Sequence, residues 1–234
     1  MSAIFKREFK SFFTTPLGYV ILIIINLFSG IYFWFGTLYS DTVDMTFVFS
    51  GFTLVVLSAM PILTMRLLSE ERRQKTDQAL LTAPVSLAGI VLAKFFAALL
   101  LYIIGISVTL VYSVVLAFIA QPTWGYILGN YLGLLLMGAA LIAVGLFISS
   151  ITENQLVAAI VSYAVMFFLL MFDAFTNLIP SAFISSLLYS ISFQSRYNSF
   201  VAGIVSLSNV LYFLSFTVIC LFLTTRVMEK RRWS

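Results

Sequence analysis

Apolar runs of about 20 residues recur along the sequence, and they restrict the possible folds more than any other feature. A helix needs about 20 mostly apolar residues to cross the roughly 30 Å hydrocarbon layer of a bilayer. The runs contain almost no charged residues and are longer than the core of a soluble domain requires. In a bilayer, helices satisfy their own backbone hydrogen bonds. The sequence therefore predicts an all-α polytopic membrane protein.

Six membrane-spanning helices are expected from these runs. We place them at residues 16–38, 47–67, 90–119, 127–149, 156–175 and 210–225. Pro61 lies inside the second span, where proline removes a backbone hydrogen bond and kinks a helix. Residues 1–15 precede the first span, 68–89 join the second to the third, and 176–209 separate the last two. The 234 residues are expected to form one transmembrane domain.

The basic residues orient the spans. All but one of the 13 Lys and Arg residues fall near the two termini or after the second and fourth spans, and Arg196 is the exception. Short loops rich in Lys and Arg stay in the cytoplasm, so both termini are expected to be cytoplasmic. The net charge of +4 then follows from membrane topology, and no nucleic-acid partner is expected.

The first 15 residues have the pattern of an amphipathic helix. At about 100° per residue, apolar and basic side chains fall on opposite halves, whereas Glu8 lies within the apolar arc. The residues that define the two faces are Phe5, Phe9 and Phe12 on one side and Lys6, Arg7 and Lys10 on the other. Such a helix lies in the headgroup layer, with its cations toward anionic lipid. The alternative is a merely positive anchor before the first span.

The segment 65–95 concentrates charge in an otherwise apolar chain. Arg66 and Glu70, and likewise Glu71 and Lys75, stand at i,i+4 spacing, which allows the second span to continue as a polar helix. A short helix then begins at Thr76 and Asp77, presents Leu80 and Leu81, and ends at Pro84. Ser86 is expected to cap the third span, and Lys94 to extend its amine toward the membrane surface. An ordinary charged loop is the alternative.

The chain lacks the motifs of several kinds of enzyme. No G-x-x-x-x-G-K-[ST] sequence is present to bind nucleotide phosphates, and the absence of His excludes H-E-x-x-H metalloprotease chemistry. The single cysteine, Cys220, cannot form a disulfide within the chain. We therefore expect no catalytic, cofactor-binding or metal-binding residue in this chain.

Residues 176–209 are too long for a simple turn and too apolar for a solvated loop, so one or two interfacial or re-entrant helices are expected on the outer face. Two charged residues near this region have open roles. Asp173 is either an intramembrane carboxylate of a transport pathway or a solvated helix end. Arg196 either pairs with Asp173 or meets the headgroup of a substrate.

The stretch MRLLSEERRQKTDQALLTAPVSLAGIVLAKF resembles the segment after the second span in permeases of the ABC-2 type. The beginning KREFKSFFTTPLGYV, the close NVLYFLSFTVICLFLTTRVMEKRRW and the six-span layout are similar to permeases of gliding-motility-type bacterial ABC exporters. Lys75 departs from the Gly that often precedes the Thr in such proteins, which leaves the bend there undefined. The resemblance implies a fold like that of type V ABC exporters, with an amphipathic elbow helix, a cytoplasmic coupling helix and extracellular re-entrant helices.

The resemblance also implies a role, that of the permease subunit of an ATP-driven exporter in the bacterial cytoplasmic membrane. Its partners would be an ATP-binding subunit that holds ATP and Mg, a second permease copy or homologue, and membrane lipid. An extracytoplasmic auxiliary subunit stays open, as does the substrate. The residues expected to contact the ATPase are Glu70, Glu71, Thr76, Asp77, Leu80, Leu81, Pro84, Glu153 and Asn154.

Two functions of other classes remain as alternatives. One is an ion-coupled carrier or channel that works without an ATPase. It would need ionisable residues within the membrane and often two related halves, and the six spans show neither clearly. The other is a membrane scaffold that anchors other proteins and transports nothing.

Overall fold

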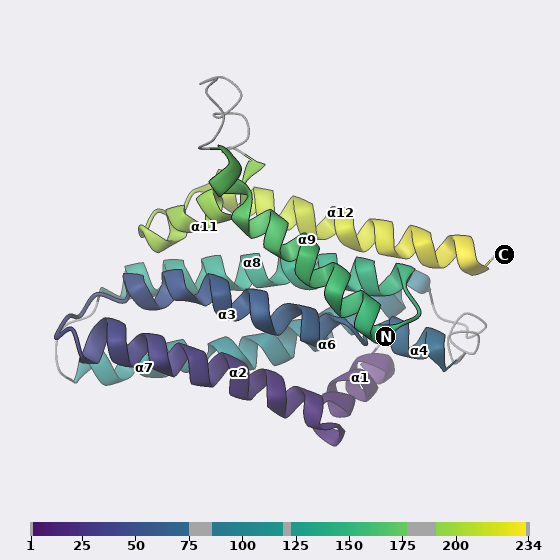
Figure 1. Cartoon of the computed structure of the whole chain (residues 1–234), viewed down its shortest axis with the longest axis horizontal. Coiled ribbons are helices and arrows are strands. Elements are labelled where there is room, and N and C mark those ends of the chain that lie inside the picture. Colours follow the sequence, from purple (N-terminus) through teal and green to yellow (C-terminus); the bar gives the residue numbers. More distant parts are fainter. Residues whose placement is uncertain (1, 75–85, 119–122, 177–190, 233–234) are drawn as a thin grey trace.

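The computed structural model of the chain describes residues 2–74, 86–118, 123–176 and 191–232. Every regular element in these ranges is a helix. The long helices run roughly along one axis, and both termini lie at the same end of the bundle (Figure 1). Six helical segments are long and apolar enough to cross a membrane, in agreement with the expected number. They are Pro16–Leu38, Thr46–Arg73, Leu87–Ala117, Trp124–Ile151, Gln155–Asp173 and Leu207–Arg232.

The chain begins with a short helix set at an angle to the first span. Helix α1 (Ser2–Thr14) packs mainly against α6 and α2. Thr15 has an extended backbone, which ends α1, and Pro16 occupies the first turn of α2 (Pro16–Phe33), where its fixed φ suits a helix start. The span ends in the π-helix η1 (Trp34–Leu38).

The second span is interrupted, whereas the sequence allowed it to continue as one polar helix. Helix α3 (Thr46–Thr64) includes Pro61 and ends in a turn, and α4 (Ser69–Arg73) begins after it. Leu67 and Leu68 in this turn are buried. The charged part of the segment is therefore a separate short helix, able to take a direction different from that of α3.

The third span is also divided. Helix α6 (Leu87–Ile106) begins where Ser86 accepts a hydrogen bond from the Gly89 N–H (3.2 Å), which is the cap expected from the sequence. It is followed by α7 (Val108–Ala117), with Ser107 between them. The Ser107 hydroxyl donates to the Ile104 carbonyl (2.7 Å), a local bond of the kind that bends helices.

Helix α8 (Trp124–Ile151) is the centre of the bundle, since α12, α3, α6, α9 and α11 all pack against it. Small residues allow this close packing. Gly138 faces the ring of the fully buried Tyr102, whose hydroxyl donates to the Leu134 carbonyl (2.9 Å). Gly145 faces the side chain of Thr64 on α3 in the same way.

The last part of the described chain contains three helices, α9 (Gln155–Thr176), α11 (Phe193–Val201) and α12 (Leu207–Arg232). Helix α11 packs on α8 and α9 at the end opposite the termini. It is anchored there by the buried hydroxyl of Tyr197, which donates to the Phe49 carbonyl (2.6 Å). Of the region expected to hold re-entrant helices, residues 177–190 lie outside the described ranges.

Candidate functional site: a polar network at one end of the bundle

At the end of the bundle that holds both termini, α1, α4 and α6 meet around Lys94. The side chain of Lys94 is only 1% exposed. Its Nζ atom lies 3.2 Å from Glu8 Oε1 on α1 and 3.0 Å from Glu71 Oε1 on α4. The sequence predicted that this amine would reach toward the membrane surface, but the structure buries it between two carboxylates.

Arg7 closes the cluster from the solvent side. Its Nη2 atom lies 2.7 Å from Glu8 Oε1 and 2.9 Å from Glu71 Oε1. The guanidinium and the Lys94 amine therefore share the same two carboxylates, so that charges alternate in sign around the cluster. The hydrogen bond with Glu8 raises the pKa of Arg7 above its ordinary value, and partial burial opposes this rise.

The energetic role of this cluster is to fix geometry. Removal of one partner from a buried ion pair costs about 3–5 kcal/mol, because the other charge stays buried without compensation. An intact buried pair adds little net stability, because desolvation offsets the attraction. The cluster therefore favours the observed placement of α1 and α4 on α6, because moving either helix away would take a carboxylate from the buried Lys94 amine.

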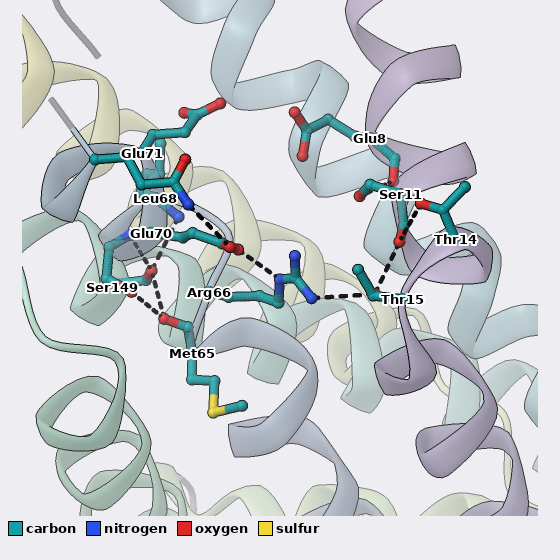
Figure 2. A network of polar contacts seen from close by, with 12 residues as sticks. Glu8, Ser11, Thr14, Thr15, Met65, Arg66, Leu68, Glu70, Glu71 and Ser149 are labelled. Carbon is teal, nitrogen blue, oxygen red and sulfur yellow. Dashed lines mark hydrogen bonds and ion pairs between the residues drawn. The ribbon is translucent and has the colours of Figure 1, made fainter. Parts of the chain in front are cut away.

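Arg66 links the start of the first span to α4. Its Nε atom donates to Glu70 Oε2 (2.7 Å), which is the i,i+4 pair expected from the sequence. Its Nη1 atom donates to Thr15 Oγ1 (3.1 Å), and this hydroxyl in turn donates to the Ser11 carbonyl (2.9 Å). Figure 2 shows these contacts as a continuous chain from α1 to α4.

Ser149 on α8 supplies the cap that α4 lacks. The backbone N–H groups of Leu68 and Ser69 both donate to Ser149 Oγ (3.0 Å each), and Ser149 Oγ lies 3.2 Å from the Met65 carbonyl, to which it donates (Figure 2). Leu68 occupies the N-cap position of α4 and has no side-chain oxygen to accept these bonds. The fully buried Ser149 therefore joins the break in the second span directly to the fourth span.

Arg72 extends the network to the turn between α8 and α9. Its Nη1 atom donates to the Ile151 carbonyl (2.6 Å), and its Nη2 atom lies 2.8 Å from Glu153 Oε1. Next to Glu153, the side chain of Asn154 accepts a hydrogen bond from the Leu156 N–H (2.9 Å) at the start of α9. Arg231 near the end of α12 also reaches this turn, where it donates to the Ser150 carbonyl.

A cavity of about 320 Å³ opens between α1 and α4. Groups of both charge signs line it, and they come from the network just described. The lining residues are Arg7, Glu8, Ser11, Phe12, Arg66, Leu67, Glu70, Glu71, Gln74 and Lys94. Among the residues that the structure describes, no group of three or more Cys, Asp or Glu side chains is arranged to hold a metal ion. The cavity is therefore polar and carries charged groups of both signs.

Part of the predicted site lies within the described residues, and the rest lies outside them. Four of the predicted contacts lie at the same end of the bundle: Glu70 pairs with Arg66, Glu71 with Lys94, and Glu153 with Arg72, while Asn154 caps α9 next to Glu153. The remaining predicted ATPase contacts fall outside the described residues. They are Thr76, Asp77, Leu80, Leu81 and Pro84.

The two faces of α1 are separated as expected, but much of its apolar face meets the protein. Phe12 is buried, and Phe5 and Phe9 are half-buried against the core. Lys6 and Lys10 are exposed.

Several residues of the network were not assigned a site role from the sequence, among them Glu8, Lys94 and Ser149. Glu8 had a visible signal, because it is the one charged residue in the apolar arc of α1. The sequence indication for Lys94 was weaker, since it was only that a charged residue stands inside an apolar run. Ser149 had none, because its partners lie about 80 positions away in the chain.

Together, the fold and the network define a polytopic helical membrane protein whose charged residues gather at one end of the bundle. A family model described as ABC-2 family transporter protein matches residues 36–227. This match covers most of the chain, so the chain belongs to the ABC-2 family of transporter proteins, as the resemblance indicated. A search of the curated proteins finds no match.

Membership in this family establishes the general role of the chain. It is the membrane permease subunit of an ABC transporter, and such subunits are typically not catalytic themselves. Permeases of this family generally work with an ATP-binding subunit.

Proposed function

We propose that the chain is the transmembrane subunit of an ATP-driven exporter and that a separate ATP-binding subunit docks at the end of the bundle that holds both termini. The observation that carries this proposal is the polar network centred on Lys94 and Ser149. It connects α1, α4, α6 and the α8–α9 turn at one end of the bundle. A partner that pushes on any of these elements acts on all of them.

The force would enter through the segment that follows α4. Residues 68–89 would act as the coupling region, with Leu80 and Leu81 seated in a groove of the ATPase. Movement of this segment would pass from α4 to α8 through Ser149 and to α6 through Glu71 and Lys94. Because buried ion pairs are costly to break, these contacts would move together as one unit.

Glu153 would provide a second contact with the ATPase. It lies 69% exposed beside Arg72, in the turn between α8 and α9. A partner that touches both α4 and this turn would therefore contact two segments that Arg72 already joins. Asn154 would shape the turn by capping α9.

The membrane orientation follows from charge. Nearly all described cations lie at the end with the termini, which would face the cytoplasm by the positive-inside rule. Helix α1 would then lie as an elbow helix in the inner headgroup layer. ATP and Mg would bind to the partner subunit, and a second permease copy or homologue would complete the transporter in the bacterial cytoplasmic membrane. An extracytoplasmic auxiliary subunit remains compatible with this arrangement.

The test is co-purification with the ATPase encoded next to this chain. The double substitution Leu80→Asp and Leu81→Asp should abolish both the association and any change in ATP hydrolysis. A matched control is Tyr39→Asp with Ser40→Asp, two exposed residues at the other end of the bundle, which should leave the association intact. Unchanged binding of the Leu80 and Leu81 variant would contradict the docking site.

A transport assay separates the exporter from the alternatives. In liposomes, an exporter should move its cargo only when the ATPase and ATP are present. Transport driven by an ion gradient without the ATPase would instead identify a carrier or channel. Cellular function that survives a block of ATP hydrolysis in the partner would identify a scaffold.

A further inference from the structure

An arginine is held against α12 at the end of the bundle opposite the termini. The Nη1 atom of Arg196, on α11, donates to Ser208 Oγ (3.0 Å) and to Asn209 Oδ1 (2.9 Å) at the start of α12. Its guanidinium lies 5.3 Å from the centre of the Tyr212 ring. These contacts hold a cation in a defined place, and among the described residues no other Lys or Arg lies at this end.

A groove of about 620 Å³ runs from Arg196 along the outer face of α12. Polar groups lie at the end of the groove near the start of α12, at Arg196 and Ser208, and mainly apolar side chains follow along the helix. Leu211, Val218 and Ile219 are 55%, 63% and 56% exposed. The lining consists of Arg196, Ser208, Leu211, Tyr212, Leu214, Ser215, Val218 and Ile219. The groove is thus amphipathic, with one cationic end.

The length of the groove matches one leaflet of a membrane. Ser208 and Ile219 are separated by about 16 Å along α12, at roughly 1.5 Å per residue. This is about half of the roughly 30 Å hydrocarbon layer. A molecule with its charged group at Arg196 would therefore reach the middle of the bilayer with its apolar part.

We propose that this groove binds a phospholipid with a negatively charged headgroup, from the leaflet opposite α1. The phosphate would lie against the positive charge of the Arg196 guanidinium, because this group pairs well with phosphate. One acyl chain would lie along Leu211, Leu214 and Val218, where it would gain van der Waals contact. This site does not depend on the ATPase, so it stands or falls separately from the proposed function.

The experiment uses the full chain in nanodiscs of phosphatidylcholine and phosphatidylglycerol. A trace of phosphatidylglycerol carries a photoreactive group on its acyl chain, and crosslinked peptides are mapped after irradiation. We expect crosslinks on α12 between Leu211 and Ile219. Unlabelled phosphatidylglycerol should compete for them better than phosphatidylcholine by about tenfold, a difference that one charge-assisted contact can supply.

Three variants test the assignment. Arg196→Gln should reduce the α12 crosslinks by about tenfold, and Arg196→Lys should retain part of them. Val218→Trp keeps the cation and fills the groove, so it should also remove the crosslinks if the acyl chain lies there. As a control at the other end, Lys10→Gln should leave the α12 crosslinks unchanged.

The outcomes separate the proposal from its rivals. Equal competition by the two lipids would show an ordinary lipid-facing surface and overturn the proposal. Crosslinks that survive in both Arg196→Gln and Val218→Trp would do the same. Protection of the groove by a second copy of the chain, seen as protein dimers crosslinked through α12, would show a subunit interface in place of a lipid site.

Discussion

Lys94 Nζ lies 3.0 Å from Glu71 Oε1, and this pair joins the third span to the short helix that follows the second. The amine is almost completely buried, while Glu71 is 16% exposed. Glu8 makes a second contact with the same amine at 3.2 Å. A single buried cation therefore holds α1 and α4 against α6, and its removal is the most direct test of the network.

Lys94→Met should destabilise the protein by less than the about 3–5 kcal/mol of a fully uncompensated buried charge, since Glu8 and Glu71 would lose the buried amine and keep only Arg7 as a shared partner. Thermal unfolding in detergent measures this loss as a lower Tm. Lys6→Met is the matched control, because Lys6 is exposed on the same helix as Glu8. The second substitution Glu71→Gln should recover part of the loss in the Lys94→Met background, which a double-mutant cycle detects. Strictly additive effects would contradict the pairing.

Ser149→Ala should lower the stability of the protein, because α4 would lose its cap. The N–H groups of Leu68 and Ser69 would both lose their acceptor, and a buried unsatisfied group costs about 1–3 kcal/mol. Ser150→Ala is the control, because the Ser150 hydroxyl donates only within its own helix, to the Phe147 carbonyl. We expect a clearly lower Tm for Ser149→Ala than for Ser150→Ala. Equal Tm values would show that water or a shift of the turn replaces the cap.

The number of candidate spans could be predicted because membrane thickness sets the length of an apolar run. The interruptions could not. The break before Ser69 depends on Ser149, which lies far away in the sequence, and the break at Ser107 divides a run that is apolar on both sides. Periodicity reports a local preference for a helix. The break before Ser69 also depends on a hydrogen-bond acceptor from another helix, and the break at Ser107 on a single local bond to the Ile104 carbonyl, and neither changes the apolar pattern.

The same distinction applies to the site. The contact between Arg66 and Glu70 could be predicted, because residues four apart face each other on a helix. Glu71 contacts Lys94 and Arg7 from other helices, two partners that helical spacing does not indicate, whereas Lys75, its predicted i,i+4 partner, lies outside the described residues. Local spacing identified the charged segment and could not tell which distant charge each carboxylate would meet.

Arg72→Gln should loosen the turn between α8 and α9 more than Glu153→Gln does. Glu153 is 69% exposed, and exposed ion pairs contribute about 0–1 kcal/mol. Arg72 also donates to the Ile151 carbonyl, a bond that the glutamine is too short to replace in full. Hydrogen exchange of the backbone amides after Ile151 should therefore accelerate in Arg72→Gln and change little in Glu153→Gln. Equal acceleration would mean that the ion pair alone holds the turn.

Gly138→Ala should destabilise the centre of the bundle, because a Cβ atom there would collide with the ring of Tyr102. This ring cannot move aside easily, since it is fully buried and its hydroxyl is bonded to the Leu134 carbonyl. Overpacking of this kind costs about 1–3 kcal/mol. Gly125→Ala is the control in the same helix, because outside its own turn of helix nothing lies within 4 Å of its added Cβ, and alanine should be neutral or stabilising there. A comparison of the two Tm values decides the matter: if Gly138→Ala unfolds no earlier than Gly125→Ala, then α6 and α8 are not packed as closely as the structure places them.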